Sequence, residues 1–418
     1  MTGPSLRRNF AWAFLGSAVL AASQFAIQIA IAKLAPSAVE GSRRVGDWTL
    51  ANAITGPIFV FFFFKLRVVV TTDTRDEHPW PVYASTRGWA MLAALAVTAG
   101  VIALRYREPV AWIIAAVALA KACEGGSDVI YGYQQRRDRL DRVARSQIAR
   151  GAVAVLAGIG VLVATDSVAA VAWATAAVYA GGLLWDAWST HDTTAMPRSD
   201  AAAIGRLLRQ YGQLGLVTAI GSLQINIPRY FLEHHVSRSE LGVFGMMQTL
   251  LMLGGLIINA MTNAVMARLA RHVAADEWRP FARTLRTSIL IGAALGVSAV
   301  LLAAGLGRPV LRMAFSEEFA RHSGVLVWLA ATSALLWMYL FLGTALDAMR
   351  SYRVQPWIHG TTAIVIAVAC WRLVPGHGLY GATWSMMIGY AVECTMFVVV
   401  VALPLRAKLR AASPDDSV

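Results

Sequence analysis

The stretch QIAIAK at residues 28–33 recurs 196 positions later as QINIPR at residues 224–229. Each copy begins with a glutamine and ends with a cation, and each lies in an otherwise apolar segment. The register continues without a gap, so that Gly46 matches Gly242 and Trp48 matches Phe244. A match that covers two apolar segments and the loop between them indicates an internal duplication.

The chain is far more apolar than a soluble protein. Hydrophobic residues fill 57% of its 418 positions, and its mean hydropathy is +0.55. About 20 mostly apolar residues cross the hydrocarbon core of a bilayer. On that basis the expected fold is an all-α integral membrane protein with about 12 transmembrane helices. The predicted spans are 10–32, 47–66, 88–104, 110–131, 149–165, 168–187, 211–232, 241–266, 287–305, 323–345, 357–373 and 379–403.

These spans divide into two six-helix bundles. Residues 1–195 form the N-terminal bundle, 196–210 a cytoplasmic linker, and 211–418 the C-terminal bundle with a short cytoplasmic tail. Because each bundle has an even number of spans, both copies enter from the same side and the internal repeat is parallel. Such duplication is typical of transporters, which build a central pathway between related bundles.

The net charge of +13 is explained by an uneven distribution of basic residues between the two sides of the membrane. With both termini cytoplasmic, most lysines and arginines fall on the inner side of a multi-pass inner (cytoplasmic) membrane protein, as the positive-inside rule requires. The basic excess therefore implies no nucleic acid partner. Its densest run, from Arg136 to Arg150 in the loop after the fourth span, indicates topology or contact with anionic lipids. A role in substrate binding is the alternative.

Cations inside apolar segments are candidate functional residues, because a charge at the bilayer centre costs roughly 2.5–3.5 kcal/mol on insertion scales. Lys33 and Arg229 occupy equivalent positions near the outer ends of the first and seventh spans. Snorkelling to the interface is the simpler interpretation for Lys33, whereas Arg229, behind Pro228, is a candidate to face a cavity. Lys65 and Arg67 have apolar residues on both sides, which favours an interfacial anchor for Lys65 and a cavity cation at Arg67.

Lys121, Glu124 and Asp128 share one helical face of the fourth span, because they are three and four residues apart. Either they neutralise one another in an internal salt bridge, or Asp128 or Glu124 titrates or binds a coupling cation beside a pathway. Glu393 in the twelfth span is a lone candidate of the same kind. Neutral amides on the first, seventh and eighth spans join helices or contact a substrate: Gln28, Gln224, Asn226, Gln248, Asn259 and Asn263.

Enzyme signatures are absent from the sequence. It contains no phosphate-binding Gly-Lys-Ser/Thr loop, no Gly-x-Ser-x-Gly elbow and no His-Glu-x-x-His motif. Its three cysteines suit neither a metal site nor a disulfide framework. We therefore expect a protein that is not an enzyme and that uses no metal or cofactor.

Several motifs in order carry a resemblance to a known family. The first half has Gly46-Asp47-Trp48-x-Leu50-Ala51, then Pro57, Leu66-Arg67 and Thr71-Thr72-Asp73. The second half has Asn226-Ile227-Pro228-Arg229-Tyr230, Glu240-Leu241-Gly242-Val243-Phe244 and Ala267-Arg268-Leu269-Ala270. Over nearly its whole length the chain resembles the Wzx-type polysaccharide biosynthesis proteins of the multidrug, oligosaccharidyl-lipid and polysaccharide (MOP) exporter superfamily.

This resemblance implies a flippase for an undecaprenyl-pyrophosphate-linked oligosaccharide, which moves from the cytoplasmic to the outer leaflet by alternating access around a cationic cavity. Its partners would be membrane lipids, a polysaccharide polymerase and glycosyltransferases. Carried over by position, Arg67 and Arg229 are the leading headgroup ligands, followed by Lys33 and Lys65. In the same reading Gln28, Gln224 and Asn226 contact sugars, and Asp128 and Glu124, beside Lys121, are the candidates for proton or sodium coupling.

Other functions remain open at this point. A multidrug or cation antiporter of the same superfamily would favour acidic over basic groups in its cavity, and a lipid II flippase would have two more spans. An integral-membrane glycosyltransferase or polymerase is a different class, and it would need an acidic catalytic site on a large outer loop. Only short outer loops are predicted.

Overall fold

The computed structural model describes residues 6–73, 77–190, 200–351 and 353–411. Within these ranges the chain is helical and contains no β-strand. Part of the predicted linker (residues 196–199) and most of the predicted tail (412–418) lie outside them. The chain forms two compact units, Met1–Ser222 and Leu223–Val418.

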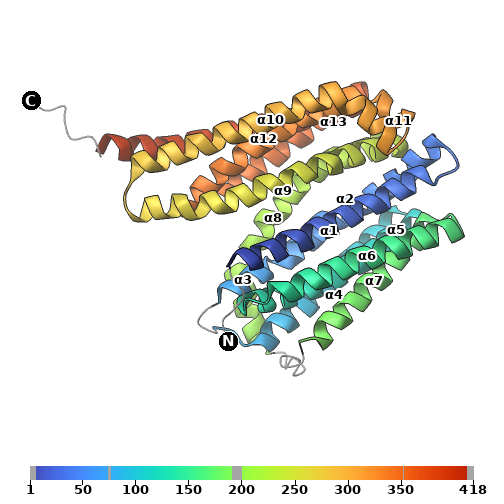
Figure 1. The fold of residues 1–418 in the computed structure, drawn as a ribbon, viewed down its shortest axis with the longest axis horizontal. Coiled ribbons are helices and arrows are strands. Elements are labelled where there is room, and N and C mark those ends of the chain that lie inside the picture. The colour runs from blue at the N-terminus through green and yellow to red at the C-terminus, as the bar shows by residue number, and fades with distance from the viewer. Residues whose placement is uncertain (1–5, 74–76, 191–199, 352, 412–418) are drawn as a thin grey trace, which may run out of the picture. The chain divides into compact units, whose positions relative to one another are not determined.

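The first unit is organised around α5 (Val110–Arg136) (Figure 1). This helix packs against α2 (Ala38–Phe63), α3 (Leu66–Thr72), α4 (Trp80–Arg105), α6 (Leu140–Thr165) and α7 (Val168–Trp188). The helix α1 (Leu6–Lys33) packs on α6 and α2, and the unit ends within α8 (Ala201–His235). The α2–α4 connection and the α7 terminus lie at the end of α5 that carries Arg136. Arg44 and Asp166 join the α1–α2 and α6–α7 connections at the other end.

The second unit contains the rest of α8 and is organised around α12 (Ser323–Ala348). This helix packs against α9 (Arg238–Ala274), α10 (Trp278–Ala314), α11 (Glu317–Arg321) and α13 (Gln355–Ala411). In both units the fourth long helix is thus the one that contacts most of the others. This common plan is what a duplicated bundle predicts.

Eleven of the twelve predicted spans each lie in a helix, and the span 47–66 crosses from α2 into α3. Among the described residues, eight helical stretches are long and apolar enough to cross a membrane, and a bent pair within α9 makes a ninth. The stretch Gln355–Arg410 counts as one of the eight, but Gly378 interrupts it with φ 50° and ψ −125°. This break separates the predicted spans 357–373 and 379–403. Two helices do not belong to the set: α5, which carries Lys121, Glu124 and Asp128, and α8, which carries Arg229.

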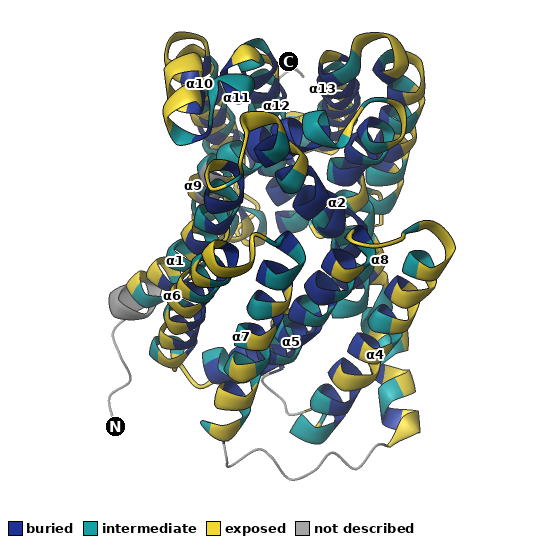
Figure 2. Ribbon diagram, turned by 90° about the vertical axis from the view of Figure 1, so that its right-hand side faces the viewer, coloured by how far each residue is buried: buried dark blue, intermediate teal, exposed yellow. Residues whose placement is uncertain are grey.

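Large apolar side chains are exposed along the helices. Figure 2 shows that exposed positions recur along many of the helices. Leu104, Leu156 and Met313 are 90%, 73% and 77% exposed. In water such a surface would cause aggregation, whereas lipid tails cover it without penalty. The protein is therefore a multi-pass membrane protein.

The structure corrects two of the predicted boundaries. The basic run was assigned to a loop that continued to residue 148, but α6 already begins at Leu140, so Arg150 lies well inside a helix and is buried. In addition, residues 201–210 of the predicted linker belong to α8.

Candidate functional site

A break between α2 and α3 determines where Arg67 lies. Phe64 and Lys65 both adopt left-handed backbone conformations, with φ 48° and 50°, so α2 stops and α3 starts in a new direction. On α5, Gly132 allows α3 to approach closely, because a Cβ at this position would lie 2.8 Å from the carbonyl oxygen of Arg67. Lys65 remains exposed, while Arg67 is held half-buried against α5.

Two arginines share the carboxylate of Asp128. Nη1 of Arg67 lies 3.6 Å from Oδ1 of Asp128, and Nη2 of Arg87, on α4, donates to Oδ2 at 3.1 Å. Arg67 also donates to Oε1 of Gln135 at 3.3 and 3.4 Å. One carboxylate faces two guanidinium groups, so this cluster carries a net positive charge.

Arg87 is the most deeply buried cation of the first unit. It is 1% exposed, its guanidinium lies 4.9 Å above the ring centre of Phe63, and its Nε and Nη1 atoms are buried without a hydrogen-bond partner. The sequence suggested no role for Arg87, because it stands one residue before the predicted third span, whereas the helix begins at Trp80.

Lys121, Glu124 and Asp128 of α5 do not behave as one set. Asp128 pairs with arginines from α3 and α4 rather than with Lys121, so the predicted internal salt bridge is not how its charge is neutralised. Lys121 and Glu124 are half-buried on the same helix, as is Gln28 on α1.

A second ion pair in this unit is closed and neutral. Nη2 of Arg150 donates to Oδ2 of Asp186 at 2.9 Å and to Oγ of Ser127 at 2.6 Å, and both charged side chains are 2% exposed. This pair joins α5, α6 and α7. Sequence reasoning missed it, although an aspartate near the end of an otherwise apolar span was a signal.

Arg229 is a buried cation with neutral partners. It is 8% exposed, its Nε donates to Oε1 of Gln248 at 2.8 Å, and its Nη1 donates to Oδ1 of Asn226 at 3.1 Å. In the part of the second unit that the structure describes, no carboxylate forms an ion pair with Arg229. Amide oxygens orient the guanidinium group but leave its charge uncompensated.

Helix length explains why Lys33 and Arg229 differ. Lys33 is the last residue of α1 and is exposed, whereas α8 continues past Arg229 to His235. The size of this extension follows from the positions of the N-cap residues of the next helices, α2 and α9. Ser37 caps α2 by accepting from the Glu40 N–H, and Ser237 caps α9 by accepting from the Glu240 N–H. The caps are 200 residues apart rather than 196, so the second copy is longer by about one helical turn.

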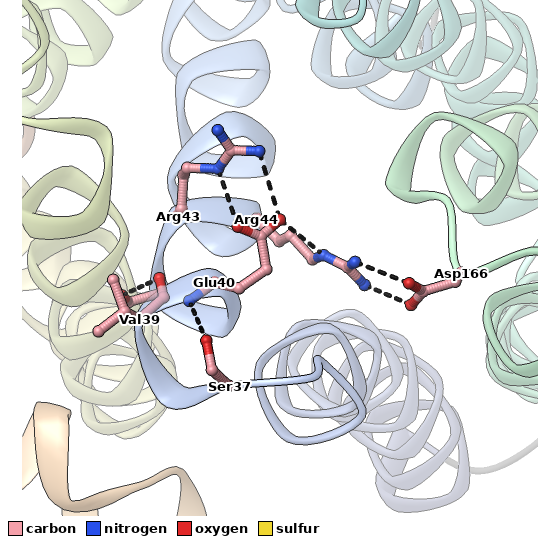
Figure 3. A network of polar contacts seen from close by, with 7 residues as sticks. Ser37, Val39, Glu40, Arg43, Arg44 and Asp166 are labelled. Atoms are coloured by element: carbon pink, nitrogen blue, oxygen red, sulfur yellow. Dashed lines mark hydrogen bonds and ion pairs between the residues drawn. The ribbon is translucent and has the colours of Figure 1, made fainter.

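The first of these caps belongs to a network that closes the end of the first unit (Figure 3). Arg44 donates hydrogen bonds to two carboxylates. Its Nε donates to Oε1 of Glu40 at 3.1 Å, and its Nη1 and Nη2 donate to Asp166 at 2.6 and 2.9 Å. The hydrogen bonds from Arg44 lower the pKa of Asp166. The network ties the α1–α2 connection to the α6–α7 connection.

Gln224 lies in a buried polar group of the second unit. Its Nε2 donates to the carbonyl oxygen of His359 at 2.8 Å and to Oε1 of Glu393 at 3.3 Å, and Nδ1 of His359 lies 2.6 Å from the same Oε1. Glu393 is fully buried, and its Oε2 has no hydrogen-bond partner. Gln224 therefore joins helices here, while Asn226 holds Arg229.

A cavity of about 290 Å³ lies beside Gln248 within the second unit. Its walls are mainly apolar, with Leu251, Trp337 and Met386 among them, and Gln248, Asn259 and Tyr390 add polar groups. Nε2 of Gln248 lies 3.3 Å from Sδ of Met386, so this one side chain connects Arg229 to the cavity wall. Asn263 is exposed and lies outside this lining. Among the described residues no group of acidic, histidine or cysteine side chains could hold a metal ion.

Comparison with known proteins places this geometry in a family. The capsular polysaccharide biosynthesis protein CapF of Staphylococcus aureus is 23% identical over 388 residues, which cover 91% of this chain and 95% of CapF. The fold is similar to that of the lipid II flippase MurJ in an inward closed conformation, with a TM-score of 0.75, 10% identity, and coverage of 96% of this chain and 88% of MurJ.

An inward-facing multidrug resistance MATE family transporter of the MOP superfamily has the same fold, with a TM-score of 0.73 and 11% identity over 94% of this chain and 96% of that chain. These likenesses confirm the expected fold class, that of MOP transporters with two helical bundles. The family model described as polysaccharide biosynthesis protein matches residues 56–323, more than half of the chain, and the protein therefore belongs to the polysaccharide biosynthesis protein family.

Proposed function

We propose that this protein flips an oligosaccharide linked to undecaprenyl pyrophosphate from the cytoplasmic to the outer leaflet of the inner membrane, for surface polysaccharide biosynthesis. The observation that carries the proposal is Arg229, a buried cation whose described partners are neutral amides. A buried charge without a counterion is costly, and an anionic ligand removes that cost. Family membership supports a polysaccharide-related cargo, and the fold supports transport.

Pyrophosphate suits the available groups. Arginine presents a planar fork of donors that matches phosphate oxygens, and such charge-assisted hydrogen bonds are strong where water is scarce. Arg229 is the main headgroup ligand in this proposal, and Arg67 contributes from a cluster that already carries a net positive charge. Lys33 and Lys65 are exposed and take a secondary part, and Gln28 and Asn226 contact sugars.

The proposed cycle is alternating access, and its driving force is a proton or sodium gradient or the membrane potential. Asp128 is the leading coupling residue, ahead of Glu124 and Lys121, because its charge state controls how strongly Arg67 is held. With both termini cytoplasmic, the product emerges on the outer face, where a polymerase would receive it. Glycosyltransferases on the inner face would supply the substrate.

Vesicle transport tests the proposal. In proteoliposomes that contain a fluorescent pyrophosphate-linked glycan lipid, the wild type should move the lipid between leaflets, and Arg229→Gln should slow this movement about tenfold to a hundredfold, as expected for lost hydrogen bonds to a charged group. Arg43→Gln is the matched control, because Arg43 is 61% exposed and lies outside the proposed site.

Two results would overturn parts of the proposal. If the folded Arg229→Gln protein moves the lipid at the wild-type rate, the assignment of the headgroup ligand is wrong. If the wild type moves no glycan lipid under any imposed gradient, the function itself is wrong.

A further inference from the structure

A second pocket lies in the first unit, at the end where α3 ends, α4 begins and α5 ends. It has a volume of about 400 Å³, within the range of small-molecule sites. Its polar wall consists of Arg136, Arg137 and His78. The rest of the lining consists of Val70 and the rings of Trp80, Tyr83 and Tyr133. The charge distribution of the sequence puts this end at the cytoplasmic surface.

The aromatic wall is a fixed corner. The rings of Trp80 and Tyr133 have centroids 4.8 Å apart at an interplanar angle of 49°. Both residues line the pocket, and their tilted rings offer aromatic surface for the apolar C–H face of a sugar ring. Such rings give large contact areas at little cost in conformational entropy.

Arg137 is held ready for an anion. Its guanidinium carbon lies 4.3 Å from the ring centre of Tyr133, a cation–π contact that holds the group beside the ring without using its N–H donors in hydrogen bonds. No described acceptor bonds these donors, nor the indole N–H of Trp80. Among the residues that the structure describes, no aspartate or glutamate lines the pocket.

The carboxylate of Asp73 accepts hydrogen bonds from residues of the pocket wall. It accepts from the Glu77 N–H at 3.0 Å, from the Tyr83 hydroxyl at 2.9 Å and from the His78 N–H at 3.4 Å. Burial opposes ionisation of Asp73, but these hydrogen bonds outweigh it and lower its pKa. Asp73 thus fixes His78 and Tyr83 in place and stays behind the lining.

We propose that this pocket binds a glycosyl phosphate, with the sugar ring on the Trp80–Tyr133 corner and the phosphate on Arg137 and Arg136. Bound at the membrane surface, such a group is the headgroup of a lipid-linked glycan, and free in solution it is a sugar phosphate. Resting on the proposed function, we assign the lipid-linked form, which makes the pocket a loading site on the cytoplasmic face. A bare anionic phospholipid would leave the aromatic corner unused.

Binding to the full chain in phosphatidylcholine nanodiscs tests this assignment. The Arg229→Gln variant serves as the background, so that the proposed transport ligand does not contribute. The probes are farnesyl-pyrophosphoryl N-acetylglucosamine and free glucose 1-phosphate, each followed by calorimetry. We expect tighter binding of the lipid-linked probe, weakened about tenfold by Arg137→Gln and by Trp80→Leu, which remove a charged donor set and a ring face.

Arg139→Gln is the matched control, since it removes the same charge two residues away, from a side chain paired with Asp141. Its affinity for the probe should stay within about twofold of the background, as a screened surface charge predicts. An equal loss in Arg139→Gln and Arg137→Gln would mean diffuse attraction to basic residues and would overturn the proposal. So would tighter binding of the free sugar phosphate, or complete displacement of the probe by phosphatidylglycerol.

The outcome is separable from that of the proposed function. If the wild type flips the glycan lipid but Arg137→Gln binds the probe normally, only the loading site is wrong. If Arg137→Gln loses the probe but the wild type flips nothing, the pocket assignment stands and the transport proposal fails.

Discussion

Buried cations of this protein differ in what neutralises them. Arg150 has Asp186 to itself, and removal of one partner from such a pair costs about 3–5 kcal/mol, which indicates a structural role. Arg67 and Arg87 divide one carboxylate between them, and Arg229 has none among its described partners. Under the proposed function, it is the residues with excess positive charge that would bind an anionic ligand.

The contacts of Glu393 allow a prediction about the stability of variants at this position. Replacement by Ala leaves the donors of His359 and Gln224 without their acceptor, and we expect a loss of about 1–3 kcal/mol in the free energy of unfolding. Glu393→Gln keeps one carbonyl acceptor and should cost clearly less. Thermal unfolding of the detergent-solubilised protein, followed by tryptophan fluorescence, measures both, and equal losses would show that the acceptor is unimportant.

Single residues were predictable where the local pattern is anomalous. Arg67 and Arg229 stand out because apolar residues surround them, and the structure places both against polar side chains of other helices. Arg87 and Asp186 were missed, and so was the pairing of Asp128, because these depend on which helices become neighbours. The predicted third span began at residue 88, eight residues after the start of α4 at Trp80, and therefore left out Arg87.

At the scale of elements, the α2–α3 break is imposed by packing rather than by local sequence. Pro57 lies inside α2, yet α2 continues through it and breaks at Phe64 and Lys65, where neither glycine nor proline stands. Gly215 of α8 is in contact there, since a Cβ on it would lie 2.6 Å from the carbonyl oxygen of Phe61. No local propensity predicts a contact between residues so far apart in sequence.

This break predicts an unusual response to glycine. A left-handed conformation costs a non-glycine residue roughly 1–2 kcal/mol, so Lys65→Gly should raise the free energy of unfolding slightly, by about 0.5–1 kcal/mol after the entropy of glycine is included. Lys65→Val should lower it, because a β-branched residue tolerates this conformation poorly.

Arg43→Gly is the control for Lys65→Gly, since it removes the same charge from an exposed position in regular helix. There we expect a loss of about 1 kcal/mol. Thermal unfolding measures all three variants. A loss in Lys65→Gly as large as that in Arg43→Gly would contradict a left-handed backbone at residue 65.

At the scale of the whole molecule, composition and repetition were sufficient to predict the fold class. The twelve apolar segments reappear as helices, and both units use the same plan around their fourth long helix. The site was less predictable, because an ungapped comparison of the two copies hid a shift of one helical turn between Lys33 and the α2 cap. Equivalent positions in the sequence therefore carry cations in unlike surroundings.

Orientation in the membrane is testable on the whole protein. In a variant without Cys123, Cys370 and Cys394, we expect Pro36→Cys to react with a membrane-impermeant maleimide in intact cells, and Arg139→Cys to react only after permeabilisation. Both positions are exposed and lie at opposite ends of the first unit. The reverse pattern of labelling would invert the topology and move the Arg137 pocket to the outer face.

Under the proposed function, the extra turn of α8 has a consequence for how the lipid-linked glycan is oriented. A lipid-linked sugar has two unlike ends, because a charged pyrophosphate joins a sugar chain to an apolar lipid tail. Two identical repeats would bind the pyrophosphate equally well, and the transported lipid would have no preferred orientation. By burying Arg229 in one copy and leaving Lys33 in the open in the other, a single inserted turn breaks the symmetry inherited from duplication. The two repeats are thereby made functionally unequal by the position of one guanidinium group.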